Sequence, residues 1–182
     1  MTLYHFSEDP GTATFEPRTP AHRPDVAPLV WAIDEWHAPM YFFPRDCPRV
    51  LLWQLPTTSP ADHERWFGAS GGARMIAHIE YAWLERMHSV PIFRYELPPH
   101  TFASLDDAGM HVSRETVTPI SMAPLGDLIE ALRAAGVELR LMETLTPLRG
   151  VWDTTLHASG IRLRNARGWN YEPAPAPEHL RG

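Results

Sequence analysis

The sequence predicts an α+β fold in which mixed or antiparallel sheets are accompanied by about four or five helices. Strand-like segments cluster along the chain without the regular strand–helix alternation of a doubly wound parallel sheet. The glycine-rich motif that binds dinucleotides in such a sheet is absent. With 182 residues, 44% of them hydrophobic, the chain can bury a core of its own, and we predict a single domain over residues 1–169.

The first half of the chain contains three strand-like segments and one clear helix start. Residues 3–6 are rich in aromatic side chains, residues 29–33 form a continuous apolar run, and residues 48–53 are again strand-like. Asp34 is placed to cap a short helix that runs to about residue 43. Ser59, followed by Pro60 and by Asp62 three residues after the cap, marks the start of a helix.

The second half predicts further helices from apolar residues at helical spacing. Ile76, Ile79, Trp83 and Met87 favour a helix over residues 73–88. A helix opening at Pro124 is expected to stop at Gly136, and another opening at Thr146 is expected to run to about residue 159 and stop at Gly160. Further strands are predicted at 91–97, around 112, at 117–122, 137–142 and 161–163, and the Pro/Ala-rich residues 170–182 are expected to form a loosely ordered tail.

Composition excludes several classes of protein. The single cysteine, Cys47, permits neither an intrachain disulfide nor a cysteine-rich zinc site. The N-terminus lacks the pattern of a secretory signal and no apolar run is long enough for a membrane span, so a cytoplasmic location is expected. The net charge of −6 argues against a nucleic-acid partner. Every basic residue is arginine, which excludes Schiff-base and P-loop lysine chemistry.

Two polar clusters have both a functional and a structural interpretation. Arg45 and Arg49 lie in a proline-bounded segment and suit recognition of a pyrophosphate or carboxylate, although a structural pair with Asp46 would use the same residues. Cys47, between them, is either an activated thiol or a small buried side chain.

The second cluster depends on the predicted helix over residues 73–88. His78, Tyr81, Glu85 and His88 would share one stripe of that helix. The stripe is either a solvated face or, with His78, Glu85 and His88 as ligands, the site of a metal-dependent hydrolase.

The order of the segments resembles that of small ADP-ribosyltransferases of the rifampin ADP-ribosyltransferase type. Tyr4-His5 resembles their first strand, Trp31-Ala32 with the following Tyr41 the second element, and the segment of Asp107 through Glu115 the later acidic and Glu-containing region. The opening Leu-Tyr-His-Phe-Ser also resembles a group of small bacterial proteins of unknown function.

The resemblance implies a split sheet, an NAD ligand and a set of site residues. His5 would bind the nicotinamide ribose, Trp31 would stack on nicotinamide, and Glu115 or Asp107 would stabilise the charge that develops as nicotinamide leaves. Tyr4, Tyr41 and either Arg45 or Arg49 would complete the cofactor-binding set, with no metal. Phe6 stands where the family has glycine, and Trp31 where it has tyrosine.

Two alternatives to this transferase stay open at the level of sequence. One is a non-catalytic module that binds a small molecule on the same fold, and the other is the metal-dependent hydrolase. Neither the acceptor substrate nor the oligomeric state follows from the sequence, and no membrane partner is expected.

Overall fold

The computed structural model describes residues 1–21, 23–170 and 176–181 and confirms the α+β class. Its strands form one antiparallel sheet of six strands and one mixed sheet of four. The single domain predicted over residues 1–169 consists of two compact units. The six-stranded unit comprises residues 1–38, 91–125 and the described C-terminal residues, and the four-stranded unit comprises residues 39–90 and 126–170.

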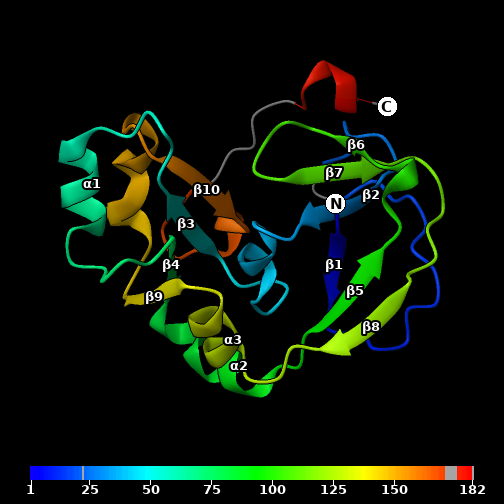
Figure 1. Ribbon diagram of the computed structural model, residues 1–182, viewed down its shortest axis with the longest axis horizontal. Helices are drawn as coiled ribbons and strands as arrows, with labels where there is room; N and C mark the ends of the chain where they lie inside the picture. The colour runs from blue at the N-terminus through cyan, green and yellow to red at the C-terminus, as the bar shows by residue number, and fades with distance from the viewer. Residues whose placement is uncertain (22, 171–175, 182) are drawn as a thin grey trace. The chain divides into compact units, whose positions relative to one another are not determined.

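The six-stranded unit has the strand order β6-β7-β2-β1-β5-β8 (Figure 1). The strands predicted at residues 3–6, 29–33 and 91–97 are all present. Their bounds and those of the remaining strands are β1 (Leu3–Ser7), β2 (Val30–Asp34), β5 (Phe93–Leu97), β6 (Ala103–Ser104), β7 (Met110–Ser113) and β8 (Ser121–Pro124). A 3-10 helix, η3 (Pro99–Thr101), follows β5.

Apolar side chains cover this sheet in two clusters. One contains Leu3, Tyr95 and Val117 among its buried residues and has Phe15 packed against it. The other groups Val26, Leu29, Val112, Ala176 and Leu180, with Trp31 packed against it. In the second cluster, residues near the end of the chain pack against residues 26 and 29.

The central strands β1 and β2 are paired over a short stretch only. Within the described residues their ladder consists of Leu3 opposite Asp34 and Tyr4 opposite Ile33, whereas β1 pairs with β5 along its whole length. Beyond Tyr4 and Ile33 the ladder between β1 and β2 is interrupted. The His5 end of β1 therefore contacts β2 through a side chain, whose hydrogen bond reaches the Trp31 carbonyl.

The C-terminal residues that are described fold against the six-stranded unit. The 3-10 helix η6 (Glu178–Leu180) places Leu180 in the core, and the main-chain N–H of Ala176 donates to Asp25 at 2.7 Å. Residues 171–175 and 182, which belong to the predicted loose tail over 170–182, lie outside the described residues.

The four-stranded unit has the strand order β10-β3-β4-β9 (Figure 1). Only the β4–β9 pair is parallel. The strands are β3 (Arg49–Trp53), β4 (Met75–Glu80), β9 (Val137–Met142) and β10 (His157–Ile161). The α-helices are α1 (Pro60–Phe67), α2 (Leu84–Ser89) and α3 (Leu128–Ala134). The 3-10 helices are η1 (Ala38–Tyr41), η2 (Tyr81–Trp83), η4 (Thr146–Asp153) and η5 (Leu163–Asn165).

The helix start predicted at Ser59 is confirmed, whereas those predicted at Asp34 and Pro124 are wrong, because Asp34 ends β2 and Pro124 ends β8. The Ser59 hydroxyl accepts from the Asp62 N–H at 3.2 Å at the start of α1, with Pro60 at the first helical position. Helix α3 is capped in the same way by Asp127, and it ends before Gly136, whose φ of +72° suits glycine.

The helix predicted over residues 73–88 is wrong in its first half. Residues 75–80 form β4, which lies between β3 and β9 and is buried along its whole length. A strand buried on both faces has apolar side chains on both faces, so its sequence carries no alternation, and here Ile76 and Ile79 coincide with helical spacing. Only residues 84–89 form the α-helix α2.

The helix predicted over residues 146–159 is shorter than expected. It is the 3-10 helix η4 (Thr146–Asp153), and residues 157–161 pair with β3 as β10. Gly160 is therefore a strand residue instead of a helix stop. Within the described residues, no helix combines the length and apolar character needed to cross a membrane.

Candidate functional site

His5 is the best-connected of the proposed site residues. Its Nδ1–H donates to the main-chain carbonyl of Trp31 at 2.8 Å, across the interrupted part of the β1–β2 ladder. Its ring lies 4.6 Å from that of Phe15, centroid to centroid. Because Nδ1 donates, the neutral ring carries its acceptor at Nε2. The contact joins two residues that are 26 positions apart in the chain.

Trp31 lies on the adjacent strand with its ring turned toward a hydrophobic cluster. The ring packs against the cluster of Val26, Leu29 and Leu180. Its Nε1–H is buried and, within the described residues, has no hydrogen-bond partner. A buried donor without a partner destabilises the fold, so this N–H is available to an acceptor that reaches it.

The register of the sheet separates the two candidate acids. Ser113 at the end of β7 lies opposite Val30 at the start of β2, so Glu115 follows the strand end nearest Trp31. Asp107 precedes β7, and the start of β7 at Met110 lies opposite Ile33, toward the other end of β2. Glu115 and Asp107 therefore lie beyond opposite ends of strand β7.

A second set of contacts ties the Glu115 segment to His5. Val117 forms a bridge with Phe15, whose N–H donates to the Val117 carbonyl at 2.8 Å. Phe15 is the residue whose ring contacts His5. The Glu115 N–H donates to the hydroxyl of buried Ser113 at 3.1 Å, which fixes the turn and leaves the Glu115 side chain exposed. We call this group of His5, Phe15, Trp31 and Glu115 the β1–β2 site.

Two arginines near the β1–β2 site did not emerge from the sequence as site residues. Arg18 forms a bridge with Leu29, immediately before β2, and Arg114 directly precedes Glu115. Both are exposed. No local pattern marks them, since their position depends on pairing between distant segments.

Tyr4 points away from the face that carries His5, because successive strand residues alternate. Its ring lies 4.9 Å from the Arg94 guanidinium carbon. Tyr4 is thus part of the same strand as His5 but belongs to the opposite face of the sheet.

At the other end of the six-stranded sheet lies a His–Asp pair that sequence analysis missed. Nδ1 of His37 lies 2.8 Å from Oδ1 of Asp34, which also accepts from the His37 N–H at 2.8 Å. The main chain of Gly109 passes so close that a Cβ there would lie 2.5 Å from Oδ2 of Asp34. The Asp-x-x-His spacing is present in the sequence, but it is also the spacing of a capping residue before a short helix, which is the role predicted for Asp34.

Arg49, Arg45 and Tyr41 belong to the four-stranded unit. Arg49 is 2% exposed, donates to the carbonyls of Met40 and Cys47 at 2.7 and 2.8 Å, and lies over the Tyr41 ring. Burial lowers the pKa of its guanidinium to about 10. These contacts give Arg49 a structural role, and they do not suit a ligand of pyrophosphate. Arg45 is exposed, and its carbonyl accepts from Arg162 at 3.2 Å.

Cys47 is a buried thiol. Burial raises its pKa to about 12, with the nearby positive charge of Arg49 acting in the opposite direction. A thiol with so high a pKa supplies almost no thiolate at neutral pH, so the buried interpretation of Cys47 is the one that fits.

The proposed metal stripe is not formed. His78 is buried in β4 and its Nδ1–H donates to the Val50 carbonyl at 3.3 Å, whereas Glu85 and His88 lie on α2 with exposed side chains. The helix that would have aligned them does not exist. In the parts of the chain that are described, no three His, Cys, Asp or Glu side chains come close enough to hold a metal ion.

The chain belongs to a family of unknown function, DUF6886, whose model matches residues 4–166. The match covers residues of both compact units and begins at Tyr4, directly before His5. Neither a curated protein nor a solved structure matches the chain.

Proposed function

We propose that the six-stranded unit binds NAD at the β1–β2 site, cleaves the bond between nicotinamide and ribose, and transfers the ADP-ribose to an acceptor or to water. The observation that carries the proposal is the hydrogen bond from His5 to the Trp31 carbonyl across the interrupted ladder. It brings together the two residues that the resemblance to ADP-ribosyltransferases singled out independently.

His5 would bind a ribose hydroxyl. The Trp31 carbonyl fixes the imidazole by accepting from Nδ1, and Phe15 packs against the ring. A ring held in this way loses little freedom when a ligand hydroxyl donates to Nε2. The residue would therefore orient the sugar next to the bond that is to be cleaved.

Glu115 is the acid we assign to the reaction, in preference to Asp107. It lies at the same end of the sheet as Trp31, and its segment is joined to His5 through Val117 and Phe15. NAD supplies a glycosidic bond whose cleavage develops positive charge on the ribose. A carboxylate positioned near that charge stabilises it, which is an electrostatic contribution of the kind that dominates many active sites.

Cationic groups for the pyrophosphate are available within the same unit. Arg18 forms a bridge with Leu29 just before β2, and Arg114 directly precedes Glu115, so both are candidates for this role. Guanidinium groups suit bidentate binding of phosphate oxygens. The binding of the pyrophosphate by Arg45, which the resemblance implied, stays a prediction.

The packing of Trp31 supports a second candidate, a module that binds NAD without cleaving it. Its ring packs against the cluster that includes Leu180, which leaves less of the ring for stacking on nicotinamide. Phe6 adds a bulky side chain after His5, where close approach of a ligand to the main chain would favour glycine.

Release of nicotinamide from NAD separates the candidates. We expect wild-type protein to release nicotinamide, Glu115→Gln to lower the rate about 100-fold or more, and Asp107→Asn to leave it unchanged. Both substitutions keep the size of the side chain, and both replace exposed carboxylates. Loss of activity in Asp107→Asn with retention in Glu115→Gln would contradict the assignment of the acid, and binding without release would favour the non-catalytic module.

A further inference from the structure

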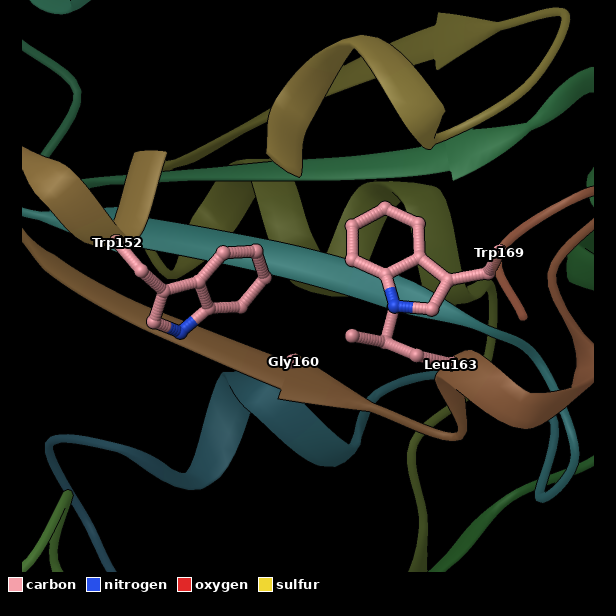
Figure 2. A pocket seen from close by; sticks show the side chains of 4 residues that line it. All are labelled: Trp152, Gly160, Leu163 and Trp169. Carbon is pink, nitrogen blue, oxygen red and sulfur yellow. The ribbon is translucent and has the colours of Figure 1, made fainter. Parts of the chain in front are cut away.

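The turn that follows strand β10 holds an arginine in a backbone conformation that is unfavourable for arginine. Strand β10 ends at Ile161, and the 3-10 helix η5 begins at Leu163, which packs against Gly160 (Figure 2). Arg162, between the strand and the helix, has a φ of +57° and a ψ of +26°. This left-handed conformation is ordinarily taken by glycine or asparagine, because it crowds a Cβ against the main chain. The reason for an arginine at this position therefore lies in its side chain.

Side-chain hydrogen bonds hold this turn against the segment that precedes β3. Nε–H of Arg162 donates to the Arg45 carbonyl at 3.2 Å, and the side-chain amide of Asn165 donates to the Asp46 carbonyl at 2.7 Å. The first residue of β3 pairs with the last residue of β10, so the turn and the segment lie at the same end of this strand pair. A site built from segments that are already fixed loses little conformational entropy when a ligand binds.

Positive charge is concentrated around Arg162. Burial lowers the pKa of its guanidinium, the charges of Arg164 and Arg45 lower that pKa further, and Asp46 acts in the opposite direction. The protein as a whole carries a net charge of −6, so a basic composition does not explain this concentration. Like charges that are held together repel one another, and an anion placed among them would relieve the repulsion.

Neither Arg162 nor Arg164 forms an ion pair within the described residues. In the part of the chain that the structure describes, half-buried Arg162 donates through Nε alone, and its terminal nitrogens are not enclosed. Arg164 lies two residues further along, in η5, and is exposed. The two guanidinium groups therefore offer N–H donors in the fork arrangement that matches the oxygens of an oxyanion.

We propose that Arg162 and Arg164 bind a phosphate group in the four-stranded unit. A phosphate dianion carries two negative charges and more oxygens than a carboxylate, so it suits two guanidinium groups better. Backbone strain together with crowded like charge is typical of binding sites. Because Arg162 is half-buried, salt screens its charge less than that of a fully exposed arginine. The site uses none of the residues of the β1–β2 site and does not depend on the proposed binding of NAD.

The test is a calorimetric titration of the full chain with inorganic phosphate at constant ionic strength, with acetate as an anion of another shape. We expect saturable binding of phosphate at millimolar concentration, about tenfold or more tighter than that of acetate. Arg162→Gln and Arg164→Gln should each weaken the binding of phosphate about tenfold or more, because each removes charge-assisted hydrogen bonds. The control Arg65→Gln removes an exposed arginine of α1 in the same unit and should leave the binding unchanged.

No saturable binding of phosphate, equal binding of acetate, or undiminished binding by Arg164→Gln would overturn the proposal, and so would an equal loss in Arg65→Gln. Because Arg164 is exposed, its replacement leaves the fold intact, and this variant decides the question if Arg162→Gln does not fold. A parallel titration with phenyl phosphate separates two sources of the phosphate group. Tighter binding than that of inorganic phosphate supports an organic phosphate as the ligand, and equal or weaker binding supports the free ion.

Discussion

His78 shows how burial of one titratable side chain affects the stability of the whole unit. It lies in the central strand β4, where burial lowers its pKa to about 4 from an ordinary value of 6.5, although its hydrogen bond to the Val50 carbonyl acts in the opposite direction. The unfolded chain therefore binds a proton between pH 6.5 and 4 that the folded chain does not. Stability is complete above that window and falls as the pH drops through it.

The expected loss from His78 is about 2–3 kcal/mol between pH 7.5 and 4.5. Urea unfolding of wild type and His78→Gln at the two pH values measures it, because glutamine keeps an N–H donor but does not titrate. The variant should lose less stability than wild type on acidification. An identical loss in both proteins would show that His78 is not protonated on unfolding.

Residues 106–109 form a turn in which the structure requires glycine at position 109 and tolerates alanine at position 108. Gly109 has a φ of +69°, and a Cβ there would collide with the His37–Asp34 pair. Gly109→Ala should lower the free energy of unfolding by about 2 kcal/mol or more. Ala108 has a φ of +46°, so Ala108→Gly relieves strain while adding freedom to the unfolded chain, and it should change stability by about 0.5 kcal/mol at most.

Chemical denaturation of the two variants checks this prediction about the turn. A loss of stability in Gly109→Ala without a similar loss in Ala108→Gly would support the close approach of the turn to Asp34 and His37. If Gly109→Ala were as stable as wild type, the turn could not lie against that pair as described.

Which elements were predictable from sequence depends on how each one is buried. The strands β1 and β5 carry aromatic or alternating patterns, and α1 begins at the capping residue Ser59, so local signals sufficed. For α3 the apolar spacing and Gly136 predicted the helix, but its start at Asp127 was missed. Strand β4 is buried on both faces and carries no alternation, which led to a helix in its place.

The residues of the proposed β1–β2 site were predictable only in part, because the contacts that join them link distant segments of the chain. His5 and Trp31 could be selected by residue type and resemblance. Their hydrogen bond, and the choice of Glu115 over Asp107, follow from strand register and from the Phe15–Val117 bridge, which join segments distant in the chain. No local pattern carries that information.

At the scale of the whole molecule, residues near the end of the chain pack into a hydrophobic cluster with residues from its first thirty. Leu180 packs with Val26 and Leu29, and the Ala27 N–H donates to the Leu180 carbonyl at 2.8 Å. Leu180→Ala should therefore lower the free energy of unfolding by about 2–3 kcal/mol. The exposed neighbour Glu178, replaced by alanine, should change it by about 0.5 kcal/mol at most. Urea unfolding measures both, and equal stability of the two variants would contradict the packing of Leu180.

The most direct test of the proposed function is a calorimetric titration of the full chain with NAD, for wild type, His5→Ala and the control His100→Ala. His100 is exposed in η3 of the same unit, outside the β1–β2 site. We expect saturable binding by wild type and His100→Ala, and a loss of at least tenfold in affinity for His5→Ala, which removes the imidazole held by the Trp31 carbonyl. No binding of NAD to folded wild-type protein at millimolar concentration, or equal affinity in His5→Ala, would contradict the account.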